Sequence, residues 1–148
     1  MTQVHMIEHG DTPAKNLILY LMELRIRIIP PLAANAPIAY QAKVVSLLSN
    51  LEQLADHEIA FAEFDWTLQK RMAELAPNPI DLIILNSYNR FYLTIAQQYF
   101  QTAERRSTST LFYKNLLTSA LQGDVERAET ITRSALEESL AWWKSFEF

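Results

Sequence analysis

The chain has 148 residues, of which 49% are hydrophobic and 20% are charged, and its formal net charge is −4. This size and composition suit one domain with a sizeable core. The negative net charge gives no sign of the basic surface that binds nucleic acid. The absence of cysteine excludes disulfides and thiolate chemistry, and two glycines in the whole chain favour helices over sheets and phosphate-binding loops.

The first predicted helix follows a polar segment, residues 1–11, which lacks helical periodicity and which we expect to be a flexible leader. Thr12 and Pro13 supply an N-cap and a first-turn proline. The residues that follow carry an apolar stripe with the spacing of one helix face, at Leu17, Leu21, Leu24 and Ile28. We expect Pro30 and Pro31 to kink or break this helix, because each removes an amide donor and crowds the preceding turn.

Two more helices are expected before residue 76. The second covers residues 37–54, and its inward positions are Val44, Leu47, Leu48 and Leu51. The third covers residues 57–75, with Asp56 as its N-cap. Its buried stripe consists of Phe61, Phe64, Leu68, Met72 and Leu75.

The rest of the chain predicts three further helices. Asn78 and Pro79 begin a fourth, which the periodicity extends as one element to about Phe100. A polar stretch, residues 101–107, separates it from a fifth helix that ends at Gly123, a natural left-handed stop. Asp124 caps the last helix. The sequence therefore predicts an all-α fold, a single bundle of six or seven helices over residues 12–148.

Several polar side chains fall where helical spacing predicts burial. Arg25 lies between apolar residues one turn before and after it, and Asp65 lies likewise between Phe61 and Leu68. Hydroxyl groups occur on the inward faces of three other helices, at Tyr99, Tyr113 and Ser139. One interpretation is a structural Arg25–Asp65 ion pair with tyrosines that merely satisfy their hydroxyls. The other is a ligand cavity, because cavities in bundles are mostly apolar with a few convergent polar groups.

From Leu24-Arg25 onward, about 125 residues resemble the C-terminal effector domain of fatty-acid-responsive regulators in the GntR family of bacterial transcription regulators. The resemblance rests on residues 55–57 (ADH), 60–63 (AFAE) with Asp65, 78–80 (NPI), 84–86 (ILN), 99–100 (YF) and 112–113 (FY), together with Tyr92, Ile95, Gly123, Glu138, Ser139 and Trp143. An ungapped match of this length is far more specific than a short motif.

The resemblance implies a sensor that binds long-chain acyl-coenzyme A, or a related fatty acyl compound, as its effector and needs no cofactor. The matched positions that would line the pocket are Leu21, Met22, Arg25, Ile28, Tyr92, Tyr99, Tyr113, Ser139 and Trp143, and Asp65 joins them as the buried acid. Arg25 and the hydroxyls would hold the thioester or pantetheine end. Members of the family act as dimers, so a homodimer is a candidate assembly.

This chain departs from the family pattern at three pocket positions. Leu136 stands where the fatty-acid-responsive members have a glycine, and a leucine there would obstruct the approach of ligand to the backbone. Ala135 replaces a tyrosine, and Gln69 replaces a phenylalanine that would pack near the acyl chain. The winged helix-turn-helix domain of the family is absent from this sequence, so we expect no direct nucleic-acid binding by this chain alone.

Other function classes have weaker support. Relatives that bind a metal use an aspartate, matched by Asp65, and three histidines, but those positions here are Gln69, Tyr113 and Ala135. No enzyme motif is found, and His5 and His9 are expected to lie in the leader. No apolar run approaches the ~20 residues that span a bilayer, so we expect a cytoplasmic protein that does not enter the membrane. The alternative function is a ligand-free dimerisation or interaction module whose pocket is filled.

Overall fold

The computed structural model describes residues 12–34, 38–74 and 77–147. Over these ranges the chain forms seven α-helices, one short 3-10 helix and no strand, which confirms the predicted all-α bundle. The helices are α2 (Thr12–Ala34), α3 (Ile38–Leu48), η1 (Leu51–Gln53), α4 (Glu58–Glu74), α5 (Pro79–Ser87), α6 (Asn89–Tyr99), α7 (Ala103–Gln122) and α8 (Val125–Ser145). The predicted leader, with His5 and His9, lies outside the described residues.

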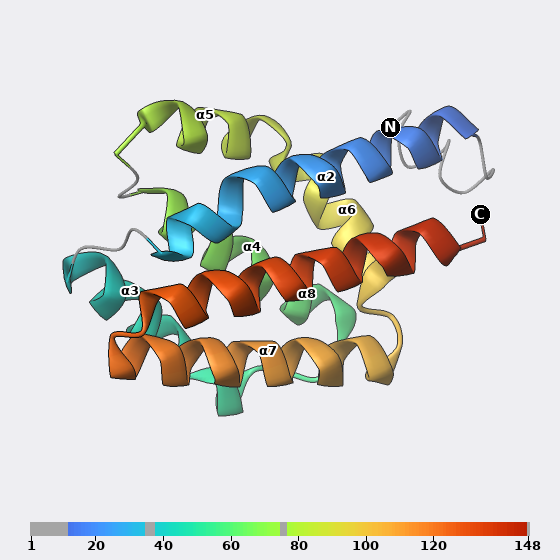
Figure 1. Cartoon of the computed structure of the whole chain (residues 1–148). Helices are drawn as coiled ribbons and strands as arrows, with labels where there is room; N and C mark the ends of the chain where they lie inside the picture. The colour runs from blue at the N-terminus through green and yellow to red at the C-terminus, as the bar shows by residue number, and fades with distance from the viewer. Residues whose placement is uncertain (1–11, 35–37, 75–76, 148) are drawn as a thin grey trace.

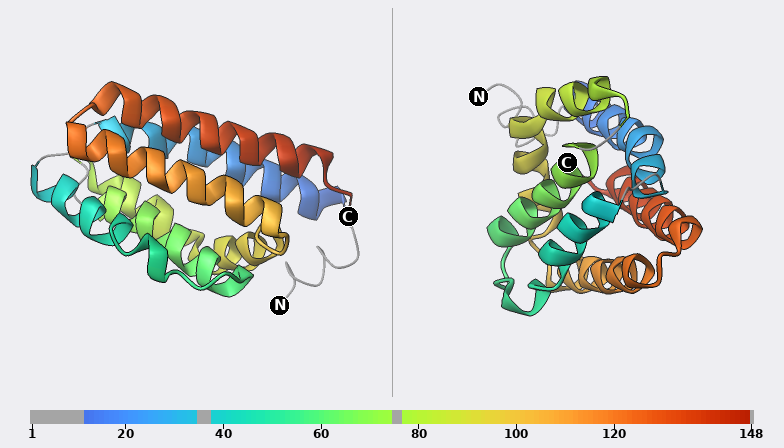
Figure 2. Two further views of the ribbon diagram at one scale, coloured as in Figure 1. Left: turned by 90° about the horizontal axis from the view of Figure 1, so that it is seen from below. Right: turned by 90° about the vertical axis from the view of Figure 1, so that its left-hand side faces the viewer.

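The first and last helices form an antiparallel pair that organises the bundle. Figure 1 shows α2 and α8 side by side along most of their length. Lys15, near the start of α2, donates to the carbonyls of Lys144 (3.2 Å) and Phe146 (3.3 Å) at the end of α8. A cation placed there satisfies carbonyls that a helix C-terminus leaves without partners. α7 packs on the other side of α8, and the remaining helices cover one side of this three-helix layer (Figure 2).

Of the two predicted effects of Pro30 and Pro31, a kink or a break, the break does not occur, since α2 continues through both prolines to Ala34. A proline at position 30 cannot donate to the carbonyl of Ile26, four residues earlier. That carbonyl instead accepts a long hydrogen bond, 3.5 Å, from the guanidinium of Arg133 on α8. Packing against α8 therefore replaces part of the hydrogen bonding that the prolines remove.

The second helix ends earlier than predicted and the third begins one residue later, while Leu75, the predicted end of the third, lies outside the described residues. α3 ends at Leu48, where Ser49 turns its hydroxyl to the carbonyl of Val45 (2.6 Å), and η1 covers three of the remaining predicted positions. α4 begins at Glu58, and its capping side chain is His57, whose Nδ1 accepts from the amide of Ala60 at 3.2 Å. Asp56, the predicted cap, instead accepts from Arg106 Nε at 2.7 Å.

The predicted fourth helix is two helices, α5 and α6, separated at Tyr88. Tyr88 has φ −112° and ψ 15°, outside the helical region, and its amide closes the end of α5 by donating to Leu85 and Asn86 carbonyls. The Tyr88 ring packs edge-on against Trp66 of α4, with 6.2 Å between centroids. The bend lets both halves follow α4, which contacts α5 and α6 as well as α2 and α3.

The local signals near the end of the chain are confirmed. Gly123 adopts the left-handed conformation (φ 66°, ψ 22°) that ends α7. Asp124 caps α8 by accepting from the amide of Arg127 at 3.1 Å. The start of α7 was placed too late, because Thr102 caps the helix within the polar stretch by accepting from the amide of Arg105.

Candidate functional site

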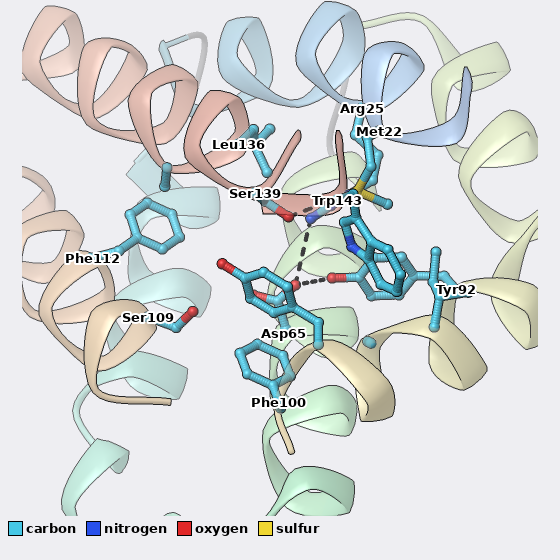
Figure 3. Close-up of a pocket in the computed structure, with 14 residues that line it drawn as sticks. Met22, Arg25, Asp65, Tyr92, Phe100, Ser109, Phe112, Leu136, Ser139 and Trp143 are labelled. Carbon is cyan, nitrogen blue, oxygen red and sulfur yellow. Dashed lines mark hydrogen bonds and ion pairs between the residues drawn. The ribbon is translucent and has the colours of Figure 1, made fainter. Parts of the chain in front are cut away.

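The carboxylate of Asp65 on α4 lies at the centre of a buried polar cluster (Figure 3). Its Oδ1 accepts from the hydroxyl of Tyr113 on α7 at 2.6 Å. Its Oδ2 accepts from Gln69 Nε2 at 2.8 Å and from the hydroxyl of Tyr92 on α6. Gln69 is one turn further along α4, so three helices supply the donors that stabilise this carboxylate.

Arg25, which extends from α2, provides the matching positive charge. Its Nη2 lies 3.6 Å from Asp65 Oδ2, and its Nε donates to Gln69 Oε1 at 3.2 Å. The guanidinium also lies over the ring of Tyr92, 4.6 Å from the centroid. A buried charge needs a partner and hydrogen bonds to be tolerated, and here Gln69 bridges the two charged groups. The cluster is therefore electrically balanced.

Met22 connects this cluster to α8. Arg25 Nη1 lies 3.2 Å from the sulfur of Met22, and the hydroxyl of Ser139 lies 3.7 Å from the same sulfur. Sulfur is a weak acceptor, so the hydrogen bonds of the Ser139 hydroxyl and of Arg25 Nη1 to Met22 are weak. These groups could exchange the sulfur for a stronger acceptor, such as a carbonyl oxygen, at little cost.

The tyrosines of the cluster are held as neutral donors. Burial raises the pKa of Tyr113 well above its ordinary value, and the adjacent Asp65 carboxylate raises it further. Burial likewise raises the pKa of Tyr92 well above its ordinary value, although Arg25 acts in the opposite direction. Ionisation would place a second negative charge beside Asp65, so both hydroxyls stay protonated at neutral pH.

A cavity of about 40 Å³ adjoins the cluster. Its lining residues are Met22, Arg25, Asp65, Tyr92, Ile95, Ala96, Tyr99, Phe100, Ser109, Phe112, Ala135, Leu136, Ser139 and Trp143. One water needs about 10–15 Å³ of such space, so this conformation admits a few waters. A long acyl chain requires an expansion of the interior.

The structure brings together seven of the ten predicted site residues around the cavity, namely Met22, Arg25, Asp65, Tyr92, Tyr99, Ser139 and Trp143. Tyr113 is fully buried behind Asp65 rather than on the cavity wall. Leu21 and Ile28 pack in the core without lining the cavity.

Tyr99 lines the cavity but forms none of the hydrogen bonds to Asp65 described above. The guanidinium of Arg105, on the first turn of α7, lies over the Tyr99 ring, 6.0 Å from the centroid. Arg105 is itself paired with Glu104 (3.0 Å) and Glu138 (3.7 Å). The predicted convergence of five polar residues therefore holds for Arg25, Asp65 and Tyr113, while Ser139 joins only through Met22.

The positions that depart from the family pattern also lie at the site. Leu136 and Ala135 both line the cavity, and Gln69 occupies the space between Arg25 and Asp65. The sequence analysis missed the bridging role of Gln69. Its position four residues after Asp65 on the same helix face was the available signal, because an amide there can donate to the acid and accept from an arginine.

Two of the three positions at which the resemblance places the histidines of metal-binding relatives contact Asp65. Gln69 and Tyr113 both donate to its carboxylate, so hydrogen bonds surround the acid. Within the described part of the chain, no group of three histidine, aspartate or glutamate side chains could hold a metal ion.

Ligand sites in helical bundles lie between the helices and combine apolar walls with a few polar groups. The Asp65 cluster and its adjoining cavity share this arrangement, on a smaller scale. The sequence matches the model of the FadR C-terminal domain over residues 5–147. The chain therefore belongs to the FadR C-terminal domain family, which confirms the resemblance to fatty-acid-responsive regulators.

Curated relatives carry the name fatty acid metabolism regulator protein. One from Shewanella pealeana is 32% identical over 103 residues, which is 70% of this chain and 43% of the relative. One from Escherichia coli K12 is 30% identical over 137 residues, which is 92% of this chain and 56% of the relative. The chain thus spans about half the length of the relatives it matches. Their name is that of a regulator, in agreement with the prediction that this chain is not an enzyme.

Proposed function

We propose that the chain is the effector-sensing domain of a fatty-acid-responsive transcription regulator, and that its ligand is a long-chain acyl-coenzyme A. The main support is the buried Arg25–Asp65 cluster beside a cavity lined largely by apolar side chains. The resemblance to fatty-acid-responsive regulators assigns these positions to the ligand pocket. The names of the curated relatives agree with a role in fatty acid metabolism.

Binding requires the closed interior to expand, and the acyl chain can supply the free energy. Burial of each methylene contributes about 0.8 kcal/mol, so a dozen contribute roughly 10 kcal/mol before ordering costs. Leu136 is the side chain whose displacement enlarges the cavity most directly, since it stands where the family has glycine. Expansion at this point separates α8 from the Asp65 side of the cavity.

The polar end of the ligand is held by Arg25 and Ser139. Both are now bonded only to the weak acceptor sulfur of Met22 on their ligand-facing sides. A thioester or pantetheine carbonyl is a better acceptor for both groups. Because Arg25 is on α2 and Ser139 on α8, a carbonyl held by both groups would link these two helices.

This proposal has further consequences for partners and location. The domain does not bind nucleic acid by itself; ligand binding controls DNA binding by a separate winged-helix domain. The regulator acts in the cytoplasm, where acyl-coenzyme A is available, and a homodimer is its expected assembly. None of the described helices is long and apolar enough to cross a membrane.

The test is calorimetric titration of the purified chain with palmitoyl-coenzyme A, with octanoyl-coenzyme A and free coenzyme A as controls. We expect binding that strengthens with chain length and weakens in Arg25→Ala and Ser139→Ala. A Tyr20→Phe variant, on the exposed side of α2, is the matched control that should bind like the parent chain. Absence of binding by a folded parent chain would refute the proposal.

The second candidate function is a ligand-free dimerisation or interaction module. The small cavity and the presence of Leu136 favour it, because together they leave little space for a ligand. The variant Leu136→Ala separates the two functions. If the cavity is a ligand site, this change should tighten palmitoyl-coenzyme A binding; if the interior is a filled core, it should only destabilise the fold.

A further inference from the structure

A second cavity, about 20 Å³, lies at the end of the bundle where α7 turns into α8. Small or apolar groups form most of its wall, including Ala33, Met72, Leu116, Ala120 and Ala128. Its polar side chains are already engaged within their own helices. Ser119 donates to the carbonyl of Asn115 at 3.0 Å, and Asp124 caps α8. The chemistry of this cavity suits a hydrocarbon end and offers nothing to a charged or polar group.

The two cavities lie along the same helices. On α8 the first is lined by Leu136 and the second by Ala128. Eight residues of helix at a rise of about 1.5 Å each separate these positions by about 12 Å. On α4 the corresponding residues are Asp65 and Met72. The second cavity is therefore further along the bundle axis from the first, in the direction away from Trp143.

Side chains on α2, α4 and α8 form a layer between the two cavities. Ile29, Leu68 and Thr132 each lie one turn from a residue of the first cavity and one turn from a residue of the second. They are among the most deeply buried side chains of the described chain, with exposed fractions of 1%, 2% and 1%.

Displacing this layer breaks none of the hydrogen bonds found between described side chains. Ile29 and Leu68 are hydrocarbon, and the hydroxyl of Thr132 has no hydrogen-bond partner among the described residues. Other helical threonines here donate to the carbonyl one turn earlier, such as Thr110 to Arg106 (2.9 Å) and Thr118 to Lys114 (3.1 Å). The layer is thus held by packing without side-chain hydrogen bonds, whereas every charged group of the Arg25–Asp65 cluster is bonded.

We propose that the second cavity binds the terminal methylenes of the acyl chain and thereby sets the chain-length preference of the domain. This inference rests on the proposed function. The acyl chain runs from the first cavity past Ile29, Leu68 and Thr132, so its terminal methylenes lie against Ala128 and Ala120. A short acyl chain ends before the layer and gains nothing from the second cavity.

The experiment fills the second cavity without touching the first. Ala128→Leu places a larger side chain in it, and Ala141→Leu makes the same change at an exposed position of the same helix as the control. Affinities of both variants and of the parent chain are measured by calorimetry for octanoyl- and palmitoyl-coenzyme A. In Ala128→Leu we expect palmitoyl-coenzyme A to bind roughly tenfold more weakly, as when two methylenes remain in water. Octanoyl-coenzyme A should bind as it does to the parent.

Circular dichroism shows whether Ala128→Leu is folded. Two further measurements test the proposal even if this variant does not fold. Ala120→Val fills the same cavity from α7 by a smaller amount and should give the same selective loss. In the parent chain, affinity should keep rising from dodecanoyl- to palmitoyl-coenzyme A, because only the longer chain passes the layer.

Equal losses for both ligands, or a plateau at dodecanoyl-coenzyme A in the parent chain, would overturn the role of the second cavity while leaving acyl binding intact. If the parent chain binds none of these ligands, both the role of the second cavity and the proposed function are refuted.

Discussion

Replacing Arg25 with methionine, or Asp65 with asparagine, removes one charge of a buried pair and leaves the other inside the bundle. The two side chains are only 5% and 12% exposed, and their charged atoms are 3.6 Å apart. Methionine keeps the length of the arginine stem, and asparagine keeps the shape of the carboxylate. The expected losses therefore come from charge and hydrogen bonding rather than from a cavity.

The magnitudes follow from this geometry. Breaking a buried ion pair by removing one partner costs about 3–5 kcal/mol. At 3.6 Å and an effective dielectric constant of about 20, the attraction between the charges is about 4–5 kcal/mol. If the two losses simply added, the double variant would lose about 6–10 kcal/mol, close to the whole stability of a typical domain. Because the second change removes a charge that the first left unpaired, we expect a total loss of only about 2–6 kcal/mol.

The assay is urea unfolding of the parent chain, both single variants and the double variant, followed by circular dichroism. The double variant should be folded, and the coupling energy from the cycle should be about 4 kcal/mol, close to the Coulomb estimate. A coupling energy near zero would refute the reasoning, because it would mean that the two charges do not interact in the folded state.

Three further predictions concern single residues. Thr132→Val should raise the free energy of unfolding by about 1–3 kcal/mol, because it removes a buried hydroxyl without a described partner while keeping its shape; a loss in urea denaturation would show that the hydroxyl is bonded. Gly123→Ala should lower the free energy of unfolding by about 1–2 kcal/mol. The loss comes from the left-handed backbone alone, because nothing lies within 4 Å of the added methyl group; an unchanged urea-unfolding midpoint would contradict this. The pKa of Tyr113 is raised on folding, so its contribution to stability is complete below about pH 10 and is lost as the pH rises further. In ultraviolet titrations of the parent chain and of Tyr113→Phe, the variant should lack one tyrosine that ionises at a raised pH in the parent. Loss of a tyrosine with an ordinary pKa would contradict the assignment.

The parts of the fold that local chemistry decides were predictable from sequence. Gly123 and Asp124 fix the turn between α7 and α8 through backbone preference and a side-chain cap, neither of which needs tertiary structure. The division at Tyr88 was not predictable, because no glycine or proline marks it and the bend depends on packing against Trp66. The continuation of α2 beyond Pro30 likewise depends on α8, which helical periodicity within α2 does not reveal.

The candidate site, too, was predictable only in part from the sequence. Helical spacing correctly placed Arg25 and Asp65 inside the bundle, because a charge amid apolar neighbours on one face must be buried and paired. Spacing gives the direction of a side chain from its helix but not its partner on another helix. The Tyr99 ring accordingly lines the cavity, while the charged group that lies over it is Arg105 rather than Asp65.

The distribution of contacts around α2 indicates how ligand binding would change the domain. α2 meets α8 along most of its length, from Lys15 to the carbonyl of Ile26, whereas its polar contacts with α4 are concentrated at Arg25. α2 and α8 should therefore move together, and their separation from α4 would have to break the buried Arg25–Asp65 contact. A ligand shifts such an equilibrium only by its difference in affinity for the two states. An acyl chain that fits only the expanded interior has that difference, because the cavity of about 40 Å³ admits only a few waters.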